Sequence, residues 1–321
     1  MHPTLNMSIN ELLAKVPLQM VRRVIPFRDG HLIPLGLKTH VIAILNITPD
    51  SFSDGGTFFH EAQGNEDLPA ELKDRLVKFH EACTASGVTF VDVGGASSRP
   101  GASHVPTEEE IRRVVPVIRF LRSMPHSLPI SIDTASPEVA AAAVDEGVCI
   151  INDISANLDV VRTKRPADVV IVMHNRGSPS TMTSLKEYPG GVLEDVVLEL
   201  YEKVQEWIKI GYRRWQVIVD PGIGFAKGVI ENMALIKEMD VFKEKMGGYP
   251  VLVGHSRKKF IDVLMNQTSL VAQDRDFGTA ALAVANVEKG VDFIRAHAFT
   301  GLTQAVRVSD AVYRPENVQQ Q

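Results

Sequence analysis

Short apolar runs in this 321-residue sequence repeatedly end on residues that can hold a ligand. The residues at or just after these ends are Asn46, Arg99, Asp133, Asn152, Asp153, Met173, His174, Asp220, Ser256, Arg257, Lys258, Arg295 and His297. Acids, amides and an amine around an apolar floor could hydrogen-bond a flat heterocycle that carries alternating donors and acceptors. A second group, which includes Asn46, Arg295 and His297, could hold a phosphate ester, alone or with a metal ion.

Each of these residues also has a purely structural interpretation. Asp133 could equally cap the helix that follows it, and Asp153 is better explained by a turn. His174 could be a structural histidine, and Lys259 is expected to be the solvated member of the basic run that follows Ser256. Asp220 ends a fully apolar run before a glycine loop, where an idle buried charge would be costly, so a functional role is favoured.

The apolar runs are predicted to be strands buried on both faces, because they are almost continuously apolar rather than alternating. They cover residues 41–46, 88–94, 129–133, 148–152, 168–174, 215–220, 250–254 and 291–297. Helix signals lie between them. Thr107 is predicted to be an N-cap with Glu110 as its capping-box partner, and Ser136 is predicted to be the N-cap before Pro137. An amphipathic helix is expected over residues 230–245.

Eight strand–helix units predict a (β/α)8 TIM barrel. An open doubly wound sheet is the alternative, but it concentrates its site at one switch point, whereas polar residues here end nearly every strand. We expect the barrel to cover residues 36–316. Residues 1–35 are predicted to be an extension or linker with a hairpin at the barrel bottom, and residues 317–321 a disordered tail. The long connections 48–66 and 96–106 are expected to be lids.

Composition narrows the class of protein. The formal net charge is -5, with 45% hydrophobic and 23% charged residues, which predicts a globular protein without a nucleic-acid partner. With only Cys83 and Cys149, both expected in the core, no disulfide framework is predicted. Because no apolar run reaches about 18 residues, no membrane span or membrane partner is expected. Dinucleotide-binding and α/β-hydrolase motifs are absent from the sequence.

Several of these motifs, in this order, resemble those of the dihydropteroate synthase family, especially its fungal type. The most specific is the twelve-residue first-loop signature at residues 45–56 (LNITPDSFSDGG). The others are 91–95 (VDVGG), 99–101 (RPG), 131–134 (SIDT), 151–153 (IND), 173–174 (MH), 220–225 (DPGIGF), 256–258 (SRK) and 295–297 (RAH). The resemblance spans residues 39–314.

The resemblance implies a transferase that joins p-aminobenzoate to 6-hydroxymethyl-7,8-dihydropterin pyrophosphate, giving 7,8-dihydropteroate and pyrophosphate. It implies Mg²⁺ as the cofactor, with Asn46 as the metal ligand. The implied catalytic residues are Asp133, Asp220, Lys258, Arg295 and His297. The implied substrate-binding residues are Asn46, Phe52, Ser98, Arg99, Pro100, Asp133, Asn152, Met173, Asp220, Gly224, Phe225, Ser256, Lys258, Arg295 and His297.

The resemblance further implies a homodimer, a sulfonamide target, and fusion to other folate-synthesis domains. It also implies a cytoplasmic location, or a mitochondrial one for a eukaryotic multifunctional protein. The chain departs from the family pattern at Ala96, Ser98, His255 and Ala298. Two alternatives stay open: a catalytically weakened pterin-binding module, and a corrinoid-linked pterin methyltransferase. The second should lack both the Asn46 loop and the 256–258 run.

Overall fold

The computed structural model describes residues 23–28, 30–48, 68–97, 105–155, 167–177, 181–267 and 271–314, without the side chain of Thr183. Residues 1–22 of the predicted N-terminal extension, the tail at 317–321, and the site residues Phe52, Ser98, Arg99 and Pro100 lie outside the described residues. The predictions about both lids fall mostly outside them as well.

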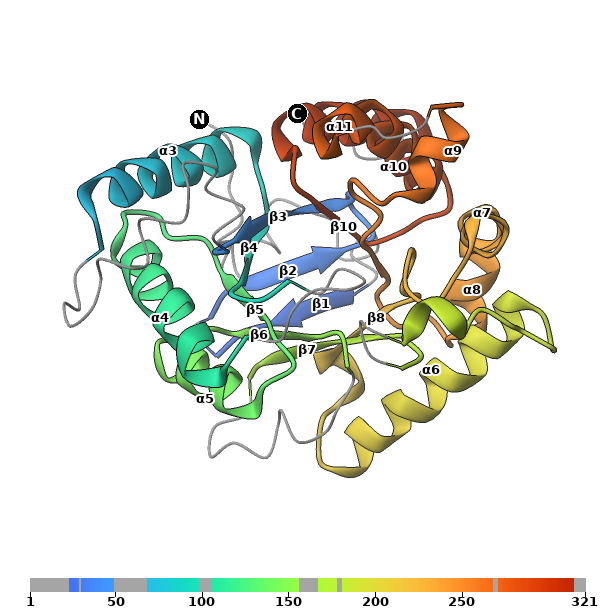
Figure 1. Cartoon of the computed structure of the whole chain (residues 1–321), viewed down its shortest axis with the longest axis horizontal. Helices are drawn as coiled ribbons and strands as arrows, with labels where there is room; N and C mark the ends of the chain where they lie inside the picture. The colour runs from blue at the N-terminus through green and yellow to red at the C-terminus, as the bar shows by residue number, and fades with distance from the viewer. Residues whose placement is uncertain are drawn as a thin grey trace.

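Eight parallel strands form the predicted barrel at the centre of Figure 1. They are β3 (His40–Asn46), β4 (Phe90–Gly94), β5 (Ile130–Asp133), β6 (Ile150–Asp153), β7 (Val169–Met173), β8 (Val217–Asp220), β9 (Leu252–Val253) and β10 (Phe293–Ala296). Their hydrogen-bonded order is β8-β7-β6-β5-β4-β3-β10-β9. A parallel bridge between Val219 and Val251 joins the two end strands. The sheet therefore closes, and the open-sheet alternative is wrong.

Helices surround the strands on the outside of the barrel (Figure 1). They are α3 (Ala70–Ser86), α4 (Thr107–Ser123), α5 (Pro137–Asp145), α6 (Val192–Lys209), α7 (Val229–Lys237), α8 (Met239–Lys245), α9 (Phe260–Leu264), α10 (Asp276–Glu288) and α11 (Phe299–Tyr313). Short 3-10 turns are η2 (Met182–Ser184), η3 (Arg214–Gln216) and η4 (Ala272–Arg275). In the part of the chain that is described, no helix is long and apolar enough to cross a membrane.

The helix-start predictions had mixed outcomes. Ser136 is the N-cap of α5, where its hydroxyl accepts the N–H of Val139 at 3.4 Å, and Pro137 follows as predicted. The prediction that Thr107 caps α4 is wrong. Pro106 is the N-cap, with extended backbone (φ -58°, ψ 141°) and no side-chain cap bond. Because the fixed φ of proline suits the entry to a helix, Thr107 is already the first helical residue and not the cap.

The single helix expected over residues 230–245 is also a wrong prediction. The backbone of Glu238 leaves the helical region (φ -107°, ψ 26°), and the segment divides into α7 and α8. Each short helix buries its own apolar residues: Leu235 and Ile236 in α7, and Met239 and Phe242 in α8. The apolar spacing alone could not reveal the break, because the buried positions continue across it.

A hairpin fills the bottom of the barrel, as predicted for the end of the N-terminal extension. Its strands β1 (Arg23–Pro26) and β2 (Leu32–Leu35) pair antiparallel. Ile25 belongs to one buried cluster with Phe90 and Phe293, which lie at the amino-terminal ends of β4 and β10. Burying each such side chain contributes about 2 kcal/mol. Because this end of the barrel is closed by apolar packing, the carboxyl ends of the strands are left for a site.

Candidate functional site

Four strands bring a buried network of two acids, an amide and a guanidinium together at the barrel mouth. Arg295 of β10 donates through Nε to Asp92 of β4 and through Nη2 to Asp133 of β5. The amide Nδ2 of Asn152, on β6, donates to Asp92 Oδ2 at 3.0 Å. The predicted residues Asp133, Asn152 and Arg295 are therefore in one network, although 162 positions separate Asp133 from Arg295.

Burial sets the charges of this network. Burial raises the pKa of Asp133 to about 7, an effect that Arg295 opposes and Asp92 reinforces. Burial alone would lower the pKa of Arg295, but the charges of Asp92 and Asp133 outweigh it, so its pKa rises. The guanidinium therefore stays charged, while Asp133 can change its protonation state near neutral pH. Two carboxylates around one cation suit a ligand that brings N–H donors.

Asp220 ends β8 and faces the same mouth. Its Oδ1 accepts the backbone N–H of Gly222 at 2.7 Å. Burial raises the pKa of the Asp220 carboxyl to about 6, while the Gly222 N–H and the charge of Lys258 act in the opposite direction. Gly222 has φ 70°, and a Cβ there would lie 1.9 Å from the carbonyl oxygen of His174. Only glycine therefore allows the turn that presents this N–H to Asp220.

Lys258 lies near Asp220, and its side chain packs against Gly224 and Phe225. Its Nζ is 3.6 Å from the centroid of the Phe225 ring, a cation–π distance. A Cβ on Gly224 would meet Cδ of Lys258 at 2.9 Å, so the stem of Lys258 runs directly along this glycine. Phe225 itself packs with Met173 in a small buried cluster. The predicted residues Met173, Gly224, Phe225 and Lys258 thus form one wall.

A second predicted group lies at or just after the carboxyl ends of the neighbouring strands β3, β9 and β10. Ser256 Oγ is 3.1 Å from Nδ1 of His297 and accepts the backbone N–H of His297, also at 3.1 Å. Nδ2 of Asn46 lies 3.5 Å from Nε2 of His297. Asn46 and His297 were expected near a phosphate ester together with Arg295. Arg295 is paired instead with the carboxylates of Asp92 and Asp133.

The residues around Asn46 fit a magnesium ion that takes few ligands from the protein. Within the described ranges, no group of three or more His, Cys, Asp or Glu side chains could hold a metal ion. Asn46 offers one amide oxygen. Mg²⁺ commonly keeps several waters and takes only one or two protein oxygens together with substrate phosphates. The residues present therefore fit an ion that is held largely by a phosphorylated substrate.

Several alternatives weighed from the sequence are now decided. Asp133 does not cap α5, because Ser136 does so and Asp133 pairs with Arg295. Asp153 closes a turn by accepting the backbone N–H of Ser155 at 2.8 Å, as expected. Lys259 is exposed, while both cysteines are buried, as predicted.

Asp92 is the residue of this network that the sequence interpretation missed. It lies inside the second motif, yet no role was given to it. Its signal was present, since a carboxylate within the apolar run 90–94 must find a partner when buried. That partner, Arg295, is 203 positions away, and no local pattern identifies it.

The fold is that of a TIM barrel, its mouth carries acids and amines suited to a polar heterocycle, and the comparisons point to the same class of protein. A family described as "Pterin binding enzyme" matches residues 42–297. The folate synthesis bifunctional protein of Arabidopsis thaliana is 37% identical over 308 residues, covering 91% of this chain and 60% of that protein. The dihydropteroate synthase of Synechocystis is 36% identical over 286 residues, covering 87% of this chain and 92% of that protein.

A crystal structure of Burkholderia cenocepacia dihydropteroate synthase complexed with 7,8-dihydropteroate superposes with a TM-score of 0.75 at 29% identity, covering 92% of this chain and 98% of that one. The chain thus belongs to the dihydropteroate synthase family of pterin-binding enzymes. It spans 41% to 60% of the length of four longer folate-synthesis relatives that it matches.

Proposed function

We propose that the chain catalyses the condensation of p-aminobenzoate with 6-hydroxymethyl-7,8-dihydropterin pyrophosphate, forming 7,8-dihydropteroate and pyrophosphate. The observation that carries the proposal is the convergence of Asp133, Asp220, Lys258 and Arg295 on one buried mouth. The bound 7,8-dihydropteroate of the Burkholderia relative supports it, since that molecule joins a pterin to p-aminobenzoate.

The acids and amines of the mouth match the edge of a pterin. The 2-amino group and N3–H of a pterin are adjacent donors, which suit a carboxylate such as Asp220. Asp133 and Asn152 would hold the remaining edge, and the ammonium of Lys258 would donate to a ring acceptor. Met173 would pack against the ring face. Every one of these side chains belongs to the largely buried rim described above.

In the proposed reaction, the bond between the pterin methylene and the pyrophosphate oxygen breaks, and a bond from the amine nitrogen to that methylene forms. The amine nitrogen then loses one proton to the released pyrophosphate. Positive charge spreads from the methylene into the ring, and ionised Asp220 would stabilise it. Pyrophosphate takes the electron pair, and Asn46, Arg295 and His297 would stabilise its charge, with Ser98 and Arg99 from the second loop. When bound, Mg²⁺ on Asn46 would supply further positive charge there.

The p-aminobenzoate site is proposed on the side of the Lys258 side chain that faces away from the pterin site. Phe225 would pack against the aromatic ring, and Ser256 and Lys258 would hold its carboxylate. Phe52 and Pro100, from the first two loops, would complete the site. Closure of these loops would exclude water, which otherwise competes with the amine for the methylene.

Turnover tests the proposal directly. The purified protein should release pyrophosphate from the pterin substrate with Mg²⁺ present, and release should depend on p-aminobenzoate. Binding of the pterin substrate without pyrophosphate release would favour the weakened module instead. A corrinoid-linked methyltransferase is disfavoured because both Asn46 and the 256–258 run are present. The departures at Ala96, Ser98 and Ala298 bear on the rate, and reverting each to the family residue would measure their effect.

We also propose a homodimer. Large apolar side chains are exposed on helices that contact one another: Ile230 on α7 is 79% exposed, Phe277 on α10 is 88% exposed, and Val263 lies on α9. Large exposed apolar side chains on packed helices commonly mark an interface. Light scattering should give a dimer mass for the wild type and a smaller mass for Phe277→Asp. A monomeric wild type would contradict the proposal.

Fusion to other folate-synthesis domains and the compartment are proposals too. Two matched relatives are named as mitochondrial bifunctional proteins, which supports the mitochondrial location for this chain. Mass spectrometry of the native protein would give its full length, and fractionation of the source cells would give its compartment.

A further inference from the structure

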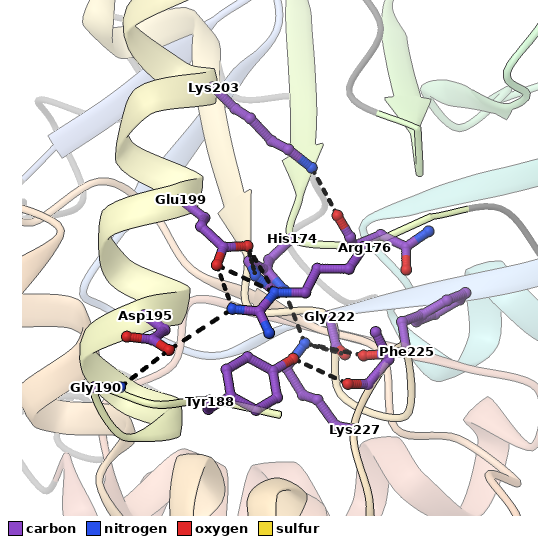
Figure 2. Close-up of polar contacts among 12 residues, drawn as sticks. His174, Arg176, Tyr188, Gly190, Asp195, Glu199, Lys203, Gly222, Phe225 and Lys227 are labelled. Atoms are coloured by element: carbon purple, nitrogen blue, oxygen red, sulfur yellow. Dashed lines mark hydrogen bonds and ion pairs between the residues drawn. The ribbon is translucent and has the colours of Figure 1, made fainter. Parts of the chain in front are cut away.

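A second buried polar cluster lies behind the site, and of its side chains only His174 was a candidate to hold a ligand in the sequence analysis. Its centre is Lys227, which is only 5% exposed and ends the loop that follows β8. Nζ of Lys227 lies 3.1 Å from the carbonyl oxygen of Gly222, 3.0 Å from that of Phe225, and 2.9 Å from Nδ1 of His174 (Figure 2). The ammonium thus reaches two carbonyl groups of the very loop that shapes the site.

The hydrogen bonds of the cluster determine the protonation states of His174 and Glu199 and the tautomer of His174. His174 Nε2 is 3.0 Å from Oε2 of Glu199, on α6. The hydrogen bond from His174 lowers the pKa of Glu199 to about 2, and burial, with the charge of Lys227, lowers the pKa of His174 to about 4. At neutral pH the imidazole is therefore neutral, donates from Nε2 to the carboxylate, and accepts at Nδ1.

Lys227 must then donate to all three of its neighbours. Burial lowers its pKa to about 7, while the charge of Asp220 acts against this. A neutral amine has only two hydrogens, so it could not satisfy two carbonyl groups and an imidazole that accepts at Nδ1. The hydrogen-bond geometry therefore requires the ammonium form. Glu199 supports that form through His174, because the carboxylate fixes the imidazole tautomer.

The outer end of the cluster is tied to the same loop by a second route. Arg176 holds Glu199 with Nε 2.9 Å and 3.1 Å from its two carboxylate oxygens. The guanidinium lies 4.0 Å from the centroid of the Tyr188 ring, and the Tyr188 hydroxyl donates to the carbonyl oxygen of Ala226 at 3.0 Å. Figure 2 shows Arg176 and Glu199 beside the residues of the loop.

The loop needs such support because its backbone is unusual. Gly222, Gly224 and Ala226 all have positive φ (70°, 81° and 49°), and for alanine this conformation costs about 1 kcal/mol. The same loop presents the Gly222 N–H to Asp220 and places Gly224 and Phe225 against Lys258. A shift of the Gly222 and Phe225 carbonyl groups would therefore move groups on both sides of the site.

We propose that Lys227 is a positioning residue, whose ammonium, oriented through His174 by Glu199, holds the 222–227 loop in the shape that the pterin site requires. The link to pterin rests on the proposed function. The effect on the loop conformation and on the pKa of Asp220 does not rest on the proposed function, so it can be measured without any ligand.

Three variants separate positioning from charge. Lys227→Met removes the ammonium, and Glu199→Leu removes the carboxylate that fixes the tautomer. Lys203→Met is the matched control, because Nζ of Lys203 donates to the carbonyl oxygen of Asn175 at 3.0 Å, in the same cluster but away from the loop. The ligand-free readouts are hydrogen exchange at the 222–225 amides and the pKa of Asp220 from carboxyl carbon NMR.

Positioning predicts exchange at least tenfold faster in Lys227→Met and Glu199→Leu, and a raised Asp220 pKa in both, because the Gly222 N–H bond weakens. Lys203→Met should leave both readouts at the wild-type values. Glu199→Leu is decisive, because removing a negative charge would by itself lower the pKa of Asp220. An unchanged or lowered Asp220 pKa in this variant overturns the proposal.

Glu199 is one-third exposed on α6, so Glu199→Leu keeps the test available if Lys227→Met does not fold. Calorimetry with a 6-hydroxymethylpterin ligand then gives the link to the site. Binding should weaken at least tenfold in both cluster variants and less than twofold in Lys203→Met. A wild type that binds no pterin would contradict the proposed function, while the exchange and NMR results would still decide the role of Lys227.

Discussion

Replacing Asp220 with asparagine should weaken pterin binding by an amount that depends on pH. The substitution keeps the shape of the side chain and an oxygen for the Gly222 N–H, which lies 2.7 Å away in the wild type. It replaces the second carboxylate oxygen with a donor. Each hydrogen bond to a charged group contributes about 1.5–3 kcal/mol, so a loss of about 3 kcal/mol, or roughly a hundredfold in affinity, is expected at pH 8.

The pH dependence follows from the free-state pKa of Asp220, which burial raises to about 6. At pH 5 only about a tenth of the carboxyl groups are ionised, so wild-type affinity should fall by about tenfold relative to pH 8 from this group alone. Asp133, with its pKa raised to about 7, acts in both proteins and cancels in their ratio. The hundredfold ratio between wild type and Asp220→Asn should therefore shrink to about tenfold at pH 5.

Calorimetric titration with 6-hydroxymethylpterin between pH 5 and 8.5, at constant ionic strength, measures this ratio. Thermal unfolding is the control. Because the folded-state pKa of Asp220 lies above the unfolded value of 3.8, the stability that this carboxyl contributes is lost as pH rises through about 6. The Asp220→Asn variant should consequently be at least as stable as wild type at pH 8. A ratio that stays constant with pH, or near-equal affinities at pH 8, would refute the assignment of Asp220.

Three further outcomes are expected. Acidification from pH 6.5 to 4 should destabilise the fold, because burial lowers the pKa of His174 and His255 to about 4 and of His40 to about 3. Each histidine that stays neutral costs up to about 1.4 kcal/mol per pH unit in urea unfolding. The raised pKa values of Asp133 and Asp220 act in the opposite direction, but they are two groups against three, so a flat profile would contradict the expected net loss. Gly222→Ala should lose more than about 3 kcal/mol of stability, because the new Cβ meets the His174 carbonyl oxygen. Gly290→Ala is its control, with φ 76° and no neighbour within 4 Å, and should lose about 1 kcal/mol in the same chemical denaturation. Asp92→Leu should leave Arg295 without one of its two carboxylates and abolish pterin binding in the calorimetric assay, whereas retained binding would show that Asp92 is dispensable.

The sequence predicted the barrel well because each strand carries its own signal. Continuous apolar runs require burial on both faces, and a polar residue at the end of such a run, as at Asp220, marks the rim. Contacts between distant strands carry no such local signal. Asp92 pairs with a residue 203 positions away, and the acceptors of Lys227 become apparent only when the loop is folded back on it. Sequence patterns therefore identify which residues reach the rim more readily than they identify their partners.

The order of the strands also divides the polar side chains of the rim into two groups. β9, β10 and β3 are neighbours in the sheet, and they bring Ser256, His297 and Asn46 together on one arc. The strands from β4 round to β8 carry the acids and the amide on the other arc. Arg295 is the exception, since it starts on β10 and reaches Asp92 and Asp133. In the proposed reaction the phosphate end would occupy the first arc and the pterin edge the second, so we expect the bond that breaks to lie beside Arg295, where a single guanidinium contacts both the acids that hold the ring and the leaving group.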